Sequence, residues 1–286
     1  MNEAEFIAAL RGLPLHPGAH GLADDAAVFT AGDELLVVTH DAIAEGVHYF
    51  PGTDPFDIAW KLVAVNLSDL AAKGAAPIGV LIGAVLVPDA ERFVEGLRAI
   101  LERYHVPLLG GDTIALPDGT PATFGCTAIG RATHRPVPAR TGAQPGDALW
   151  IVGTIGAAML GYRDRTGEAF LRPQPLLAAG QTLAPHVHAM MDVSDGVLLD
   201  ARRMAQASGC TATITLADLP FAPGIDADDR LAAASWGDDY ALLFSCPPER
   251  VPPVPATRIG AMGPAGPLPL LVDGAPPPAR LGYEHA

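Results

Sequence analysis

Lysine is almost missing from this chain, with only Lys61 and Lys73 among 286 residues. Together with a formal net charge of −14, this scarcity argues against nucleic acid or an anionic membrane as the main partner. It also excludes a phosphate cradle built from lysines. Cysteine is nearly as rare, and Cys126, Cys210 and Cys246 are too far apart in sequence to form a CxxC pair. Neither a disulfide framework nor a zinc site is therefore indicated.

Long apolar segments are missing as well. The longest, IGVLIGAVLV at residues 78–87, is well short of the ~20 residues that a membrane-spanning helix needs, and is more typical of a buried strand. The N-terminal stretch MNEAEFIAAL is acidic and lacks the basic region of a signal peptide, so we expect a cytoplasmic location. Because 49% of the residues are hydrophobic, the chain can bury a sizeable core in one large domain or two ordinary ones.

Hydrophobic periodicity predicts alternating strands and helices, so the fold class is α/β or α+β. Strands are expected at 35–39, 78–87, 106–109, 122–130, 148–152, 187–193, 211–216, 240–245 and 257–262. Helices are expected at 2–11, 55–73, 89–104, 154–163, 196–208 and 226–234. The segment HRPVPARTGAQPGD at 134–147 is rich in Pro, Gly and Arg and separates two such groups. We therefore expect one domain at 1–135 and a second at 136–286.

The helix expected at 55–73 carries a carboxylate among small apolar residues. Lys61, Ser68 and Asp69 are spaced at i, i+7 and i+8, so they share one face. A solvated stripe is one interpretation of that face. Ala, Val and Leu at most other positions favour instead a helix that is buried nearly all round. A buried carboxylate needs a cation or several hydrogen-bond donors, so Asp69 is a candidate ligand.

Aspartate is the acid that this chain has in excess, with 22 Asp against 10 Glu. Its short carboxylate suits turns, helix starts and the coordination of hard cations. Five aspartate clusters fall beside expected strands, in GLADDAAVF, LLVVTHDAIAEGVHYF, VPLLGGDT, AMMDVSDGVLLD and WGDDYALLF. A single such aspartate is more often a cap, but ligand sites favour strand ends and helix N-termini. Five clusters therefore favour a shared site.

The clusters indicate phosphate chemistry that depends on metal ions. The glycines of GGDT and SDGV allow the backbone to approach a phosphate closely. Carboxylates repel phosphates unless a divalent cation such as Mg²⁺ lies between them. The chain has no G-x-x-x-x-G-K-[ST], H-R-D or D-F-G motif. If it binds a nucleoside triphosphate, metal ions must supply most of the neutralising charge.

An ordered set of motifs runs from about residue 20 to the end of the chain: DDAAV, VTHDAIAEGVHYF, KLVAVNLSDLAAKGAAP, LLGGDT, RTGAQPGD, MDVSDGVLLD, GDDYALLF and GYEH. Together they resemble the AIR synthase-like (PurM-like) superfamily and, within it, the thiamine-monophosphate kinase family. The resemblance implies an N-terminal mixed sheet that forms a homodimer contact, followed by a C-terminal α+β domain. It also implies ATP- and Mg²⁺-dependent phosphorylation of thiamine monophosphate to thiamine diphosphate by direct in-line transfer.

The resemblance assigns roles to individual residues. The implied metal ligands are Asp25, Thr39, His40, Asp41, Asp69, Asp112, Asp192 and Asp195. The implied nucleotide contacts are Gly111, Asp112, Arg140 and Ser194, and the implied substrate contacts are His48, Asp238 and Tyr283. No catalytic base is assigned. An acceptor phosphate has a second pKa of about 6 and is already largely anionic at pH 7, so it needs no strong general base. The resemblance implies that several Mg²⁺ ions stabilise the charge of the reacting phosphates.

Two departures from the family pattern leave the acceptor open. His40 stands where the family usually has Thr or Ser, and WGDDYAL stands where GGEDYEL is usual. The alternatives are another AIR synthase-like enzyme acting on a different small phosphorylated substrate and a non-catalytic nucleotide-binding scaffold. Substrate-dependent ADP formation separates the scaffold from the enzymes, and the identity of the product separates the two enzymes.

Overall fold

A computed structural model describes residues 3–117 and 119–284. Its first sheet has the strand order β1-β2-β5-β3-β4, and only the β3–β4 pair is parallel. The strands are β1 (Ala27–Ala31), β2 (Glu34–Ala44), β3 (Ala75–Val85), β4 (Leu108–Ile114) and β5 (Thr123–Ala132). Because β4 is an edge strand, it lies three strands away from β2.

The second sheet is formed by the C-terminal half and has the order β11-β8-β10-β6-β9-β7. Only the β11–β8 pair is parallel. The strands are β6 (Ala148–Val152), β7 (Ala189–Val193), β8 (Cys210–Ile214), β9 (Ala241–Cys246), β10 (Thr257–Pro264) and β11 (Leu270–Val272). The edge strand β7 faces the first half of the molecule, so its residues are available to a site between the two halves.

The helices are α1 (Glu3–Leu10), α2 (Pro55–Ala72), α3 (Ala90–Tyr104), α4 (Ala157–Asp164), α5 (Glu168–Leu171), α6 (Leu177–Leu183), α7 (Val197–Ser208) and α8 (Arg230–Ala234). Short 3₁₀ segments occur at Pro17–Leu22, Ala184–His186, Leu216–Asp218 and Ala227–Asp229. In the described ranges, no helix has the length and apolar character required to cross a bilayer.

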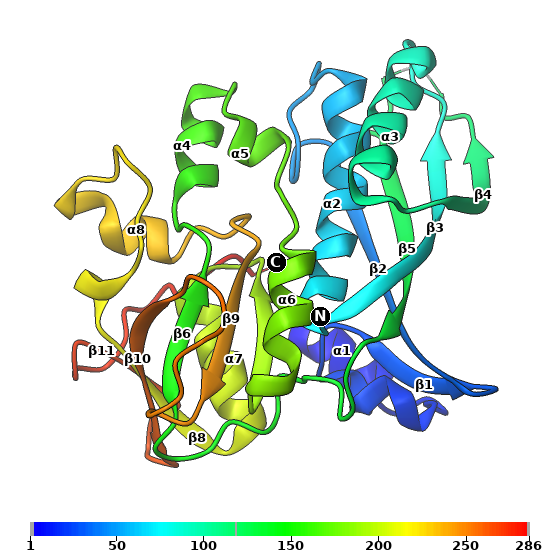
Figure 1. Cartoon of the computed structure of the whole chain (residues 1–286). Helices are drawn as coiled ribbons and strands as arrows, with labels where there is room; N and C mark the ends of the chain where they lie inside the picture. The colour runs from blue at the N-terminus through cyan, green and yellow to red at the C-terminus, as the bar shows by residue number, and fades with distance from the viewer. Residues whose placement is uncertain (1–2, 118, 285–286) are drawn as a thin grey trace.

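Helix α2 stands between the two sheets, beside α6 (Figure 1). It begins at a favourable N-terminus, because the Asp54 side chain accepts from the Phe56 N–H and Pro55 occupies the first turn. From Asp57 to its end every residue of α2 is buried, as the mixture of small apolar residues predicted. The helix packs on β2, β3 and β5 of the first sheet and on α6 and β7 of the second half.

The expected strands and helices are present, with shifted ends and four omissions. Strands β1 and β11 and helices α5 and α6 are not among the elements expected from sequence. Two expectations about strand ends were wrong. Strand β2 does not end at Thr39 but continues to Ala44, and β4 does not end at residue 109 but runs on to Ile114. The two glycines of β4 have a low intrinsic preference for strands, so the sequence pattern does not indicate its full length. Pairing with β3 stabilises the strand in the folded protein.

Candidate active site

Three carboxylates from separate segments meet where α2 passes between the sheets. Asp25 lies just before β1, Asp69 lies near the end of α2, and Asp192 lies in β7. One oxygen of each lies within 4.8 Å of the others. Asp69 is 7% exposed and Asp192 is 3% exposed. The cluster, called here the Asp25–Asp69–Asp192 triad, joins residues from both halves of the molecule.

Asp69 and Asp192 are buried carboxyl groups with few partners. The Thr39 hydroxyl donates to Asp69 Oδ2, and the Ser68 hydroxyl donates to Asp192 Oδ2 at 2.7 Å. In the described ranges, neither carboxylate forms an ion pair with a basic side chain. Burial, with repulsion from neighbouring aspartates, raises the pKa of both Asp69 and Asp192 well above the ordinary value. A hard divalent cation fits this set of oxygen donors and would remove the cost of burying them.

Asp25 differs from the other two members of the triad, because it is paired with cations. Its Oδ2 lies 2.6 Å from the Lys73 Nζ, and its Oδ1 lies 2.5 Å from an Arg140 nitrogen. Burial alone would raise the pKa of Asp25. Arg140 and Lys73 outweigh that effect, so the pKa of Asp25 is below its ordinary value. This carboxylate is therefore ionised at neutral pH.

Two further aspartates lie at the margin of the triad. Asp41 is two residues after Thr39 in β2 and so shares its face, and its backbone N–H donates to Asn66 Oδ1 at 2.9 Å. Burial raises the pKa of Asp41, with smaller contributions from the negative charges of Asp25 and Asp195. Asp195 follows β7 and forms an ion pair with Arg203. The carboxylates of Asp25, Asp41 and Asp195 are therefore close enough for their charges to interact.

Asp200, in the first turn of α7, supports the loop that carries Asp195. Its Oδ2 accepts from the Asp195 N–H at 3.1 Å, and its Oδ1 lies 2.9 Å from Arg203. Burial raises the pKa of Asp200 to about 7, although Arg203 acts in the opposite direction. Arg203 thus holds the two carboxylates together at the start of α7.

Lys61 connects two of the expected substrate contacts. Its Nζ lies 2.9 Å from Asp238 Oδ2 and 2.9 Å from the His48 carbonyl oxygen. It also lies 3.8 Å from the centre of the Phe170 ring. Burial lowers the pKa of Lys61, and Asp238 opposes the change. The His48 Nδ1 accepts from the Ala44 N–H, which leaves the ring proton on Nε2 in the neutral imidazole.

The segment after β7 carries Ser194 and Asp195, and it meets Asp238, just before β9, and Tyr283, in the C-terminal segment. The Asp238 N–H donates to the Ser194 carbonyl at 2.7 Å, and the Tyr283 N–H donates to the Asp195 carbonyl at 2.9 Å. The Tyr240 hydroxyl donates to Asp238 Oδ1 at 2.9 Å. These contacts place the expected nucleotide residue Ser194 beside the expected substrate residues Asp238 and Tyr283.

Other expected ligands lie away from the triad. His40 is on the face of β2 opposite to Thr39, and its Nδ1 is 2.9 Å from the Thr127 hydroxyl. Gly111 and Asp112 lie in β4. This strand is three interstrand spacings, or roughly 14 Å, away from β2. Gly111 is needed by the sheet itself, because a Cβ there would lie 1.9 Å from the Ile82 carbonyl oxygen. Asp112 lines a hollow of about 230 Å³ with six other residues: Gly83, Ala84, Val85, Ile114, Thr123 and Gly125.

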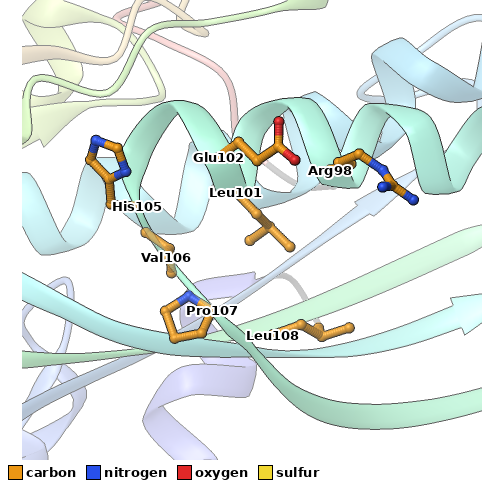
Figure 2. Close-up of a pocket in the computed structure, with 7 residues that line it drawn as sticks. All are labelled: Arg98, Leu101, Glu102, His105, Val106, Pro107 and Leu108. Atoms are coloured by element: carbon orange, nitrogen blue, oxygen red, sulfur yellow. The ribbon is translucent and has the colours of Figure 1, made fainter.

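A larger hollow of about 410 Å³ lies where α3 ends and β4 begins (Figure 2). It is lined by Arg98, Leu101, Glu102, His105, Val106, Pro107 and Leu108. None of these is an expected ligand, and Glu102 is the one carboxylate among them. This hollow is therefore not part of the metal and phosphate site predicted from the sequence.

Lys73 and Asp24 belong to the site but are not among the residues expected from sequence. Lys73 Nζ lies 2.5 Å from Asp24 Oδ1, and the Arg140 N–H donates to the same oxygen at 3.1 Å. The scarcity of lysine could have indicated a role for Lys73, because both lysines of the chain belong to the same helical motif.

Two known domain families match most of the chain. Residues 23–132 match the AIR synthase related protein, N-terminal domain, and residues 144–252 match the AIR synthase related protein, C-terminal domain. The chain therefore belongs to the AIR synthase related family. The expected two-domain α+β fold of that family is confirmed.

Curated relatives of the chain within this family are thiamine-monophosphate kinases. That of Caulobacter vibrioides is 36% identical over 257 residues, which cover 81% of this chain and 72% of the relative. That of Escherichia coli K12 is 35% identical over 253 residues, covering 79% and 76%. The solved structure of AaThiL complexed with AMPPCP and TMP superposes with a TM-score of 0.85 at 26% identity, covering 100% of this chain and 97% of that one.

Proposed function

We propose that this chain is an ATP-dependent kinase that converts thiamine monophosphate to thiamine diphosphate. The observation that carries the proposal is the Asp25–Asp69–Asp192 triad, buried between the two halves of a chain whose curated relatives are thiamine-monophosphate kinases. A structural neighbour was solved with AMPPCP and TMP, which supports the same pair of substrates. The chain spans more than two thirds of the length of these relatives.

The triad would hold Mg²⁺, with oxygens as its ligands. When bound, Mg²⁺ supplies positive charge between the carboxylates and the phosphates of ATP. Thr39 and Ser68 orient Asp69 and Asp192 by donating hydrogen bonds to one oxygen of each. The Arg140 side chain is 22% exposed while it contacts Asp25, so part of the guanidinium can face a phosphate. Phosphoryl transfer requires mainly positioning and charge stabilisation, and these residues provide both.

The residues around Lys61 would receive the acceptor. A phosphate monoester is already largely anionic at pH 7, so it can attack the γ-phosphoryl group in line without a general base. His48 Nε2–H is a donor suited to a phosphate oxygen, and Lys61 fixes the His48 backbone and the Asp238 side chain. We include in the proposal the remaining expected residues near the triad and Lys61. These are the metal ligands Asp41 and Asp195, the nucleotide contact Ser194 and the substrate contact Tyr283. Metal or nucleotide roles for His40, Gly111 and Asp112 stay predictions, since these residues lie apart from the triad.

We also propose a homodimer formed through the first sheet. Helix α2 packs against one face, where Phe93 of α3 also contacts Phe124 of β5, and the opposite face carries exposed Leu81 and Leu109 beside Gly79. An apolar sheet face that is left open favours association. Sedimentation should give twice the chain mass of 29.6 kDa, and Leu81→Arg should give a monomer. Two domains at 1–135 and 136–286 and a cytoplasmic location are part of the same proposal.

The test is the identity of the product. Protein, ATP, Mg²⁺ and thiamine monophosphate are incubated, and the product is identified by mass. We expect thiamine diphosphate with equimolar ADP, little product from free thiamine, and none in the presence of a chelator. Asp192→Asn should lower turnover by 100-fold or more, roughly 3 kcal/mol, while the exposed Asp226→Asn should match wild type.

Absence of the diphosphate at saturating substrates would contradict the proposal. ADP formation that depends on a different phosphorylated acceptor would support another AIR synthase-like enzyme instead. ATP binding without ADP formation under any acceptor would support a scaffold.

A further inference from the structure

Lys73 follows the last residue of α2 and is a buried cation inside an acidic group. Its side chain is 0% exposed, and its Nζ lies 2.5 Å from Asp24 Oδ1 and 2.6 Å from Asp25 Oδ2. The Asp24 and Asp25 side chains are 5% and 1% exposed. An ammonium ion that bridges two buried carboxylates occupies the place that a divalent cation takes between paired carboxylates in a metal site.

The charges around the triad show what Lys73 changes. Asp24, Asp25, Asp69 and Asp192 together carry −4 when ionised, and Lys73 and Arg140 carry +2, which leaves −2. One divalent cation balances that remainder. Without Lys73 the same group would carry −3, and Asp24 and Asp25 would each lose a close cation. The carboxylate that Lys73 shares with the triad is Asp25, so the ammonium and a bound cation must use different lone pairs of the same side chain.

We propose that the Lys73 ammonium takes the place of one divalent cation at the Asp24–Asp25 pair. Lys73 is thus a positioning residue: it fixes Asp25 against the triad and reduces the number of metal ions that the protein itself must hold. This inference rests on the metal site of the proposed function, though not on the identity of the acceptor. A purely structural ion pair would have the same distances but no effect on metal stoichiometry.

The experiment measures Mn²⁺ bound per chain, without ATP or acceptor, by the loss of the free-ion electron paramagnetic resonance signal. Wild type is compared with Lys73→Met, which keeps an unbranched apolar stem and removes the charge. We expect Lys73→Met to bind about one more Mn²⁺ than wild type, because Asp24 and Asp25 both lose the ammonium that neutralises them. Its melting temperature should fall without metal, and saturating Mn²⁺ should raise that temperature more than it does for wild type.

Lys61→Met is the matched control, because Lys61 is the other lysine of the chain and is likewise buried and paired with an aspartate. It should lower the melting temperature without increasing the Mn²⁺ bound. Lys73→Arg, which retains the charge, should keep the wild-type stoichiometry.

Equal Mn²⁺ stoichiometry and equal Mn²⁺-induced stabilisation in wild type and Lys73→Met would overturn the inference, as would a failure of both to bind Mn²⁺. If Lys73→Met folds only when Mn²⁺ is present, the metal replaces the ammonium and the inference holds. If it stays unfolded at saturating Mn²⁺, the inference fails. The proposed kinase activity is judged separately by the thiamine diphosphate assay on wild type.

Discussion

At the scale of single residues, the site contains two kinds of carboxylate. One kind forms ion pairs with basic side chains, and the other does not. Asp25 has two cations against it, whereas Asp69 and Asp192 have one hydroxyl donor each. Burial favours the protonated form of an unpaired carboxyl group, and a bound cation reverses that preference. The unpaired members therefore contribute to metal binding at the expense of stability in the metal-free protein.

Asp239 allows the same physics to be tested outside the triad. Its Oδ1 accepts from the Gly156 N–H at 2.9 Å, while its buried Oδ2 has no hydrogen-bond partner among the described residues. Burial raises the pKa of Asp239 well above its ordinary value. With a folded-state pKa above the unfolded one, its favourable contribution is complete below the unfolded pKa and is lost as pH rises through the folded pKa.

Asp239→Asn removes this titration and keeps an acceptor for Gly156. The melting temperature of the variant relative to wild type should therefore increase from about pH 4 to pH 8, because only wild type loses the contribution of the protonated Asp239 over that range. Thermal unfolding of both proteins across this range is the measurement. A difference that is constant with pH would show that Asp239 does not titrate between these limits.

At the scale of elements, helix α2 joins the two halves of the molecule. It packs on the first sheet and also on α6 and β7 (Figure 1). The approach of α6 depends on Gly180, because a Cβ at this position would lie 1.9 Å from the Ala71 carbonyl oxygen. The end of α2 that carries Asp69 is thus held by backbone contact with the second half.

Gly180→Val should destabilise the protein by about 1–3 kcal/mol or more, because the added atoms collide with the backbone of α2. Ala178→Val, an exposed position in the same helix, should cost no more than ~0.5 kcal/mol. Urea unfolding of the two variants and wild type gives the comparison. Equal free energies of unfolding for the two variants would show that α6 can move away from α2 without loss.

The elements were largely predictable from sequence because their periodicity is local. Apolar residues on all sides of α2 correctly indicated its burial, and Asp69 stood out within it. β4 could not be delimited, since its glycines weaken the strand signal and its pairing with β3 is a tertiary contact. For the site, motif order indicated Asp25, Asp69 and Asp192. The ion pairs of Lys73 with Asp24 and Asp25 could not be predicted, because they join residues 49 and 48 positions apart through a helix end.

At the scale of the whole molecule, the triad lies across the junction of the two halves. Asp25 and Asp69 come from the half that contains the first sheet, and Asp192 comes from the second sheet. Lys61 of α2 likewise pairs with Asp238, just before β9. A cation and phosphates bound at this junction would hold the two halves in one arrangement. Asp69 is the member of the triad that lies on the joining helix itself.

The most direct test of the account is the rate of thiamine diphosphate formation as a function of Mg²⁺, for wild type and Asp69→Asn at saturating ATP and thiamine monophosphate. We expect strict Mg²⁺ dependence in wild type. For Asp69→Asn we expect a rate at least 100-fold lower, with half-maximal activity at higher Mg²⁺, because a neutral amide is a weaker ligand than a carboxylate. Superimposable curves with equal plateaus would contradict the account and leave Asp69 as a structural residue.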